Sequence, residues 1–189
     1  MRAVLEANEF KRIIDNTKKF TANAFGPTLM QWIHLVIDAD AKEIKAEALD
    51  GHRMSVEYAR LKEADVSFDC LIKPNIPKIT KNDREAELIL EDNRLYVTVT
   101  DMRIGYTQPQ GKYYKTNELI KNANKESTNR FGINAKYLVD AMQSIDINSF
   151  DRKIAVVDIY EEHEPIVIRS GRRGEKQNLK IILPVIICD

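Results

Sequence analysis

The stretch "EIKAEALDGHRMSVEYARL", residues 43–61, decides the predicted fold, because it reads as two extended segments around one tight turn. Asp50-Gly51 is a strong hairpin signal. Gly51 supplies the positive φ that such a turn requires, and Asp50 can hold the turn through its own side chain. Asp50 and His52 diverge around such a turn, so their spacing favours a structural turn over a catalytic pair.

The segments around this hairpin predict one strand-helix-three-strand unit. A strand is expected over residues 2–7, and Asn8 is placed to cap a helix. The helix is indicated by apolar residues at helical spacing, namely Phe10, Ile13, Ile14, Thr17 and Phe20. After the Gly26-Pro27 break, three antiparallel strands follow over residues 31–40, 43–50 and 52–61.

A second, helix-poor run of strands is predicted in the middle of the chain. Its turns are expected at Asp92-Asn93 and at Asp101, and the proline-rich stretch 74–83 is too short for a full helix. The polar stretch 117–130 is typical of a linker. The strands are expected over residues 66–73, 85–92, 94–101 and 102–108.

The C-terminal part predicts the same unit as the N-terminal part. Asn134 is placed to cap a helix whose apolar stripe comprises Tyr137, Leu138, Ala141, Met142 and Ile145. Strands follow over residues 153–160, 165–170 and 179–187. The fold class is therefore α+β, with a strand-helix-three-strand unit that repeats about every 60 residues.

Composition and spacing argue against several classes of protein. The 29 Lys and Arg balance 29 Asp and Glu, so a basic surface must come from arrangement. No signal-like or membrane-length apolar segment is found, so we expect a cytoplasmic protein without membrane contact. The chain has no phosphate-cradling loop and no metal-ligand spacing, so no cofactor and no metal are expected. Cys70 and Cys188 are expected to be buried free thiols.

Three motifs in this order resemble the bacterial DNA polymerase III β sliding clamp family. They are "LDGHRMSV" at 49–56, "FGINAKYLVDAM" at 131–142 and "KIILPVI" at 180–186. The opening "VLEANEFKRIIDNTKKF" is similar to the first strand and helix of that family's middle domain, and "QGKYYKTNELI" loosely resembles the end of that domain. Residues 1–120 would then match the middle domain, and residues 121–189 the second half of the last domain.

The resemblance implies a DNA-clamp-like fold with antiparallel sheets outside and amphipathic helices on the DNA-facing side. It implies a non-enzymatic processivity factor that binds double-stranded DNA without reading its sequence, and a homo-oligomer. Because the chain holds three repeats, a twelve-repeat ring would need four chains, although two-chain, three-chain and open arrangements stay possible. The candidate DNA-facing residues are Lys11, Arg12, Lys18, Lys19 and Lys136.

The resemblance also implies a hydrophobic pocket that binds short peptides of DNA polymerase and of the clamp loader. Its candidate residues are Gly51, His52, Arg53, Met54, Asn134, Tyr137, Pro165, Ile182, Leu183, Pro184 and Val185. For the last strand, plain core packing is the competing interpretation. Two alternative functions stay open: a peptide-binding adaptor or decoy that never encircles DNA, and a hydrolase built on Asp50, His52 and distant acids.

Overall fold

The computed structural model describes residues 1–123, 132–145, 155–160, 164–170 and 178–185. The chain forms two compact units, Met1–Lys115 (unit 1) and Thr116–Asp189 (unit 2). Each unit has a hydrophobic core of its own.

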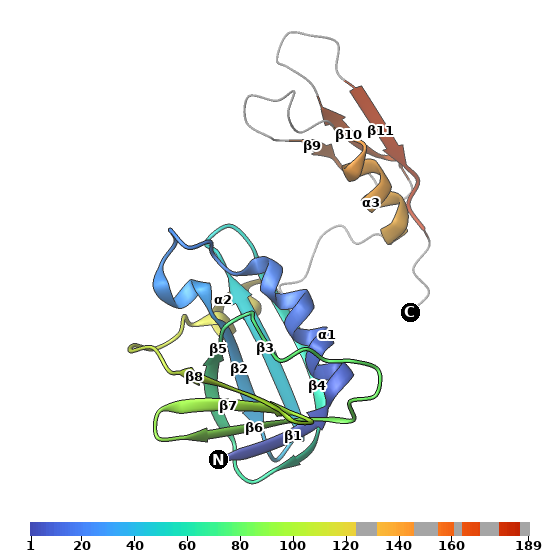
Figure 1. The fold of residues 1–189 in the computed structure, drawn as a ribbon. Coiled ribbons are helices and arrows are strands. Elements are labelled where there is room, and N and C mark those ends of the chain that lie inside the picture. The colour runs from blue at the N-terminus through green and yellow to red at the C-terminus, as the bar shows by residue number, and fades with distance from the viewer. Residues whose placement is uncertain (124–131, 146–154, 161–163, 171–177, 186–189) are drawn as a thin grey trace. The chain divides into compact units, whose positions relative to one another are not determined.

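Unit 1 contains one α-helix, two short 3-10 turns and an eight-stranded sheet (Figure 1). Its elements are β1 (Arg2–Glu6), α1 (Ala7–Thr17), the 3-10 turns Lys18–Phe20 and Thr28–Gln31, β2 (Ile33–Asp38), β3 (Glu43–Leu49), β4 (Met54–Ala64), β5 (Phe68–Ile72), β6 (Glu85–Glu91), β7 (Arg94–Val99) and β8 (Met102–Thr107). The expected run of strand, helix and three strands is confirmed, and the segment 73–84 contains no helix.

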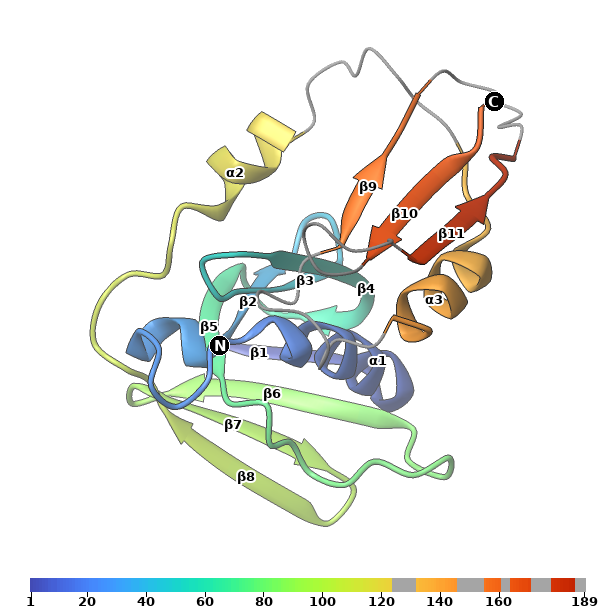
Figure 2. The same ribbon diagram turned by 90° about the horizontal axis from the view of Figure 1, so that it is seen from above.

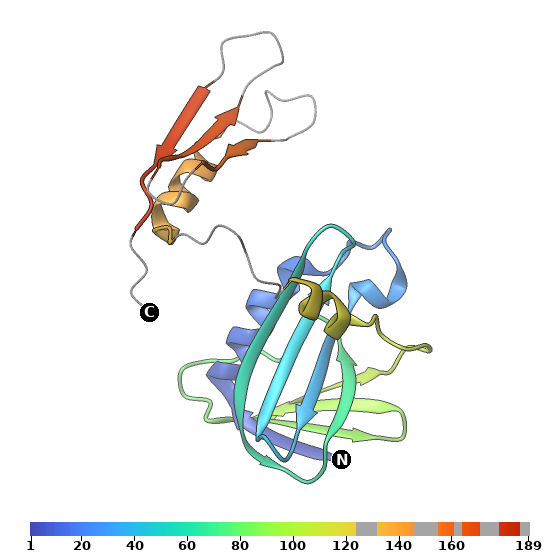
Figure 3. The ribbon, with the colours of Figure 1, turned by 180° about the vertical axis from the view of Figure 1, so that it is seen from behind.

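The sheet of unit 1 joins two repeats by exchanging their first strands. Its order is β5-β2-β3-β4-β1-β6-β7-β8, and every pairing is antiparallel. The first repeat contributes β1 to β6 of the second repeat, while the second repeat contributes β5 to β2 of the first. Figure 3 shows β2 to β5 from behind, in light blue to blue-green. Each repeat is thus completed by a strand of the other.

The helix α1 covers one face of this sheet, contacting β4, β3, β1 and β6 (Figure 2). Phe10, Ile13 and Ile14 are fully buried, as the helical spacing predicts. The expected cap at Asn8 is wrong: the helix begins at Ala7, and the preceding residue is Glu6, without a side-chain cap bond. β1 runs directly into the helix, so no intervening turn places a cap.

The hairpin turns of the second repeat lie where the sequence places them. Asp92 and Asn93 have φ angles of 46° and 59° and join β6 to β7, whose ends pair at Glu91 and Arg94. Two successive positive φ angles are typical of the primed turns that match the twist of a hairpin. Asp101 follows Thr100 in the two-residue turn between β7 and β8.

Unit 2 contains α2 (Thr116–Ala123), α3 (Ala135–Gln143) and the strands β9 (Val156–Asp158), β10 (Ile166–Ser170) and β11 (Asn178–Ile182). The strands form an antiparallel sheet of order β11-β10-β9. The linker prediction for 117–130 is wrong in its first part, which forms α2, while 124–130 lie outside the described residues. Glu118 in the first turn and Lys121 in the last suit the helix dipole.

The helix α3 begins as predicted, at the cap residue Asn134. Ala141 and Ile145 are buried, but Tyr137 and Met142 of the expected apolar stripe are 58% and 44% exposed. Among the described residues of unit 2, the buried members of the core cluster are Ala141, Ile145, Ile168 and Ile182.

Cys70 is a buried free thiol, as expected, whereas Cys188 lies outside the described residues. Burial raises the pKa of the Cys70 thiol. No helix in the described part of the chain has the length and apolar character needed to cross a membrane.

Candidate functional site

The Asp50–Arg53 turn of unit 1 is held by the Asp50 carboxylate. Oδ1 accepts the main-chain N–H groups of His52 and Arg53 at 3.0 and 3.1 Å, and Gly51 has the predicted positive φ of 90°. The turn joins β3 to β4, which pair at Leu49 and Met54. The carboxylate therefore holds the turn, which leaves the hydrolase interpretation without a base paired to His52 in the described geometry.

The Arg53 side chain is held on both sides. Its Nε donates to Asp50 Oδ2 at 2.9 Å, and its guanidinium lies 5.2 Å from the centre of the Phe20 ring. The Arg53 hydrogen bond, followed by the His52 N–H, lowers the pKa of Asp50. The turn thus presents an exposed guanidinium held in one orientation and a half-buried Met54.

In unit 2 the start of α3 and the terminal segment are brought together. Asn134 Oδ1 accepts the N–H groups of Lys136 and Tyr137, at 3.0 and 3.4 Å. Just before the cap, Gly132 pairs with Val185 in an antiparallel bridge, with a 3.0 Å hydrogen bond from the Val185 N–H to the Gly132 carbonyl. Two of the three motifs therefore meet within unit 2.

Exposure separates the candidate residues of the terminal segment. Ile182 is buried in the core of unit 2, so core packing is confirmed for it. Leu183 is 69% exposed, Val185 is also exposed, and Pro165 and Pro184 are half-buried. Leu183 and Val185 therefore remain candidates for contact with an apolar ligand.

The candidate DNA-facing residues are all exposed, but those of α1 are paired with acids. Lys11 and Lys18 both contact Asp15, whose pKa they lower. Arg12 contacts Glu9 at 2.8 Å and Glu57 at 2.7 Å. The outer surface of α1 consequently carries much less net positive charge than its basic residues suggest.

No ion pair is found for Lys19 or Lys136 among the residues that the structure describes. Lys19 in unit 1 and Lys136 in unit 2 are therefore the candidate DNA-facing residues whose positive charge is not offset by an ion pair in the described part of the chain.

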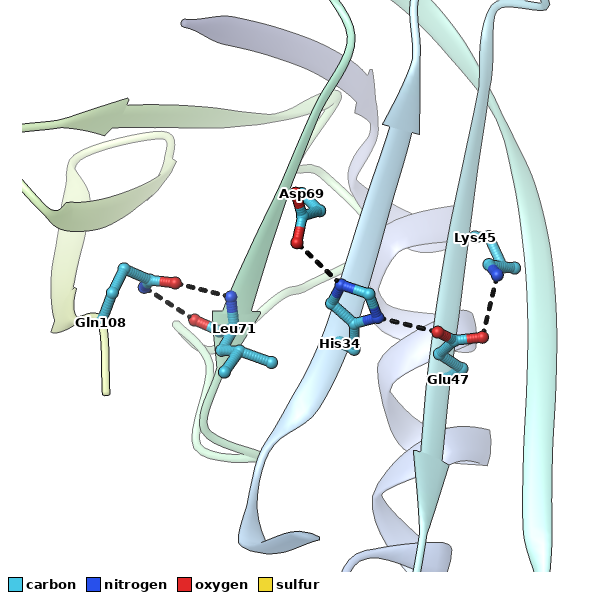
Figure 4. Close-up of polar contacts among 6 residues, drawn as sticks. All are labelled: His34, Lys45, Glu47, Asp69, Leu71 and Gln108. Carbon is cyan, nitrogen blue, oxygen red and sulfur yellow. Dashed lines mark hydrogen bonds and ion pairs between the residues drawn. The ribbon is translucent and has the colours of Figure 1, made fainter. Parts of the chain in front are cut away.

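A polar cluster that the sequence analysis missed lies on the other face of the unit 1 sheet (Figure 4). His34 Nδ1 lies 2.7 Å from Glu47 Oε1, and His34 Nε2 lies 3.1 Å from Asp69 Oδ2. Lys45 contacts the second oxygen of Glu47 at 2.9 Å. The side chain of Glu47 is only 1% exposed, so its charge is compensated at close range, as a buried carboxylate requires.

The pairing register of two strands held the signal for this cluster. His34 lies directly opposite Glu47 in the β2–β3 pair, and Lys45 is two residues from Glu47 on the same face. His34, Lys45, Glu47 and Asp69 thus form a network of close polar contacts on this face of the sheet. No three metal-ligating side chains are grouped for an ion within the described ranges.

Beside this cluster a cleft of about 720 Å³ is lined by residues of β5, by the end of β6 and by the segment 108–113 that follows β8. Gln108 spans it: the Leu71 N–H donates to its Oε1 at 2.7 Å, and its Nε2 donates to the Leu71 carbonyl at 3.0 Å (Figure 4). The Tyr113 ring lies 4.7 Å from the His34 ring at the same cleft. The Gln108 side chain therefore hydrogen bonds the main-chain N–H and carbonyl of Leu71 at the edge of β5, as a neighbouring strand would.

Solved structures of bacterial sliding clamps share this fold. The chain aligns with the DNA polymerase sliding clamp of Bacillus subtilis at a TM-score of 0.81 and 14% identity, covering 97% of this chain and 49% of that one. For the β subunit of the Streptococcus pyogenes DNA polymerase the values are 0.76 and 17%, covering 97% and 50%. For subunit β of DNA polymerase III from Borrelia burgdorferi they are 0.79 and 14%, covering 97% and 47%.

The chain thus has the clamp fold and spans about half the length of the clamp structures it matches. At such identities the likeness establishes the fold alone. No family model matches the sequence, and no curated protein matches it.

Proposed function

We propose that this chain is a sliding-clamp-like processivity factor, which associates into a ring around double-stranded DNA and binds short hydrophobic peptides of replication proteins. The observation that carries the proposal is the clamp fold over 97% of the chain. The function lies in binding and topology, so no catalytic residue is assigned.

Weak DNA contacts are compatible with this role, because encirclement rather than affinity retains a ring on DNA. The basic side chains of α1 are paired with acidic ones and contribute little net positive charge. Lys19 and Lys136 are therefore the residues proposed to face phosphate most directly. Each phosphate that is neutralised adds about 0.9 to the slope of log affinity against log salt. We therefore expect a shallow salt dependence for binding to linear DNA.

Two sets of residues are proposed to contact the peptide. The first is the turn in unit 1, where Arg53 is held by Asp50 and Phe20. The second is the exposed apolar surface around Tyr137 and Leu183 in unit 2. Aliphatic and aromatic surface with a few fixed polar groups suits a peptide with Leu or Phe anchors.

The test of the ring is retention on circular DNA. The chain is mixed with nicked circular DNA at low concentration, concentrated so that it associates, and passed through a gel-filtration column in high salt. Retention on the circle, with release after a single cut linearises the DNA, is the expected result. Equal behaviour on the circle and on the linear form would overturn encirclement.

The ion pairs of α1 favour a second candidate function, a peptide-binding adaptor that does not encircle DNA. Fluorescence anisotropy of a labelled peptide with Leu and Phe anchors separates the two. Arg53→Ala and Tyr137→Ala are each expected to weaken binding about tenfold, the scale of one interface hot spot, whereas Val66→Ala, between β4 and β5 of unit 1, serves as the control. Peptide binding without retention on circular DNA would select the adaptor.

A further inference from the structure

The two repeats of unit 1 provide a template for what unit 2 lacks. In unit 1 the strand before the helix, β1, pairs with β4 of its own repeat and with β6 of the other repeat. In return, β2, the strand after the helix, receives β5. A complete unit therefore needs two repeats that donate and accept a strand reciprocally.

Unit 2 has the parts of one such repeat. Gly132, just before α3, pairs with Val185 after β11, as β1 pairs with β4. β9 follows the helix as β2 does, and it pairs with β10 on one side. On its other side no strand of the described residues pairs with it. Among its described residues, unit 2 therefore holds a donor segment before α3 and, on β9, an edge with no strand paired to it.

The helices α1 and α3 differ in how far one equivalent apolar position is buried. Counted from the first helical residue, Ile14 of α1 and Met142 of α3 occupy the same position. Ile14 is fully buried in a unit where the helix also contacts β6 of the second repeat. Met142 is 44% exposed. Met142 is therefore an exposed apolar side chain at the helix position that is buried in the two-repeat unit 1.

The acceptor edge carries no charge that would repel a strand. Val156 and Val157 are apolar and about half exposed, and the Asp158 carboxylate is paired with Arg169 of the same chain at 2.6 Å. Proteins usually protect an exposed edge with lysine, proline or a bulge, because an open edge pairs readily with another chain. β9 has neither lysine nor proline.

We propose that unit 2 of one chain is completed by unit 2 of a second copy, through reciprocal antiparallel pairing of the segment Gly132–Asn134 with β9 of the partner. A second copy fits because one surface holds both donor and acceptor, which a two-fold axis makes self-complementary. Both exchanges within unit 1 are antiparallel, as such an axis requires. The proposal rests on the proposed clamp function, to which it adds the contact that joins the chains.

Site-specific cross-linking tests the exchange in the full-length chain. Gly132→Cys and Val157→Cys are made separately, each with Cys188→Ser, and the two chains are mixed and treated with a short bis-maleimide. Cys70 is buried and does not compete. The expected result is a cross-linked dimer in the mixture and little in either chain alone. The control pairs Gly132→Cys with Val66→Cys in unit 1, which should not cross-link.

A second pair of variants keeps the test independent of cysteine geometry. Val157→Lys at the edge should raise the dissociation constant of the oligomer at least tenfold, whereas Leu179→Lys on β11 should leave it nearly unchanged. Absence of the mixed cross-link would overturn the exchange whether the chain is a monomer or associates otherwise, and so would equal effects of the two lysines. A cross-link without retention on circular DNA would sustain the exchange while overturning encirclement, so the two failures are distinguishable.

Discussion

The helices α1 and α3 begin at equivalent places in their repeats, but their sheets cover them to different extents. Phe10, Ile13 and Ile14 of α1 are fully buried, because two repeats share the core of unit 1. In α3, Ala141 is buried while Met142 is exposed. In unit 1 the helix contacts strands of both repeats, whereas the described strands of unit 2 belong to one repeat.

The sheet faces turned away from the helices differ as well. In unit 1 this face carries the network around His34 and Glu47, whose side chains are largely buried and are paired at close range. In unit 2 the corresponding face places Leu179 and Ile181 opposite Arg169 and Val167, and Ile181 is 62% exposed. Among the described residues, unit 1 therefore buries a large core, whereas unit 2 buries a small one and exposes Leu179 and Ile181 on its sheet.

The largest effect is expected at Glu47. Glu47→Ala removes a buried carboxylate and leaves His34 and Lys45 without it, which should lower the free energy of unfolding of unit 1 by about 3–5 kcal/mol. Asp69→Ala removes an exposed partner of the same histidine and should cost at most about 1 kcal/mol. Urea denaturation of both variants checks this; similar losses would show that the network is not buried in solution.

The next effect contrasts the two helices directly. Ile14→Ala should lower the free energy of unfolding of unit 1 by about 2–5 kcal/mol, because it opens a cavity in a packed core. Met142→Ala, at the same position of α3, should leave the unfolding of unit 1 unchanged. Denaturation followed by tyrosine and tryptophan fluorescence measures both. A large effect of Met142→Ala on the unfolding of unit 1 would contradict the claim that the two helices belong to separate cores.

A smaller effect is expected at the edge of β5. Gln108→Ala removes two hydrogen bonds to the Leu71 main chain and should cost about 1–3 kcal/mol, because it leaves that edge unsatisfied. Hydrogen exchange should show faster exchange of the Leu71 amide. Exchange at Leu71 that is unchanged from the natural chain would mean that Gln108 does not close this edge.

The smallest effect is the acid response of the turns in unit 1. Hydrogen bonds from the Thr100 hydroxyl and the Thr80 N–H lower the pKa of Asp83, and the Arg53 side chain lowers that of Asp50. A carboxylate whose pKa is lower in the folded chain than in the unfolded chain stabilises the fold at pH values above 3.8, the pKa in the unfolded chain. This stabilisation is lost as the pH falls through the lower pKa of the folded chain.

Melting temperatures measured from about pH 6 to about pH 3 should therefore fall at the acid end. The fall should be smaller in Asp83→Asn, whose side chain does not titrate. Identical curves for the natural chain and Asp83→Asn would contradict the assignment.

Much of unit 1 could be predicted from the sequence, because local signals and tertiary packing agree there. Gly51 and Asp50 specify the turn, and the spacing of Phe10, Ile13 and Ile14 specifies the buried face of α1. The Asn8 cap was wrong because β1 continues directly into the helix, which local preference does not encode.

The remainder depended on pairings that a linear pattern does not contain. The His34 cluster needs the register of β2 with β3 and β5, and the exposure of Met142 depends on packing around α3 that the helical spacing does not encode. The α2 helix was missed because its polar composition resembles that of a linker.

The completion of unit 2 by a second copy is tested most directly by the molar mass in solution, measured by light scattering over a concentration series. If unit 2 is completed by a second copy, the mass reaches at least twice the 21.8 kDa of one chain, and Val157→Lys shifts it back toward that value. A mass of one chain at every concentration would contradict both the completion of unit 2 and a ring of several copies.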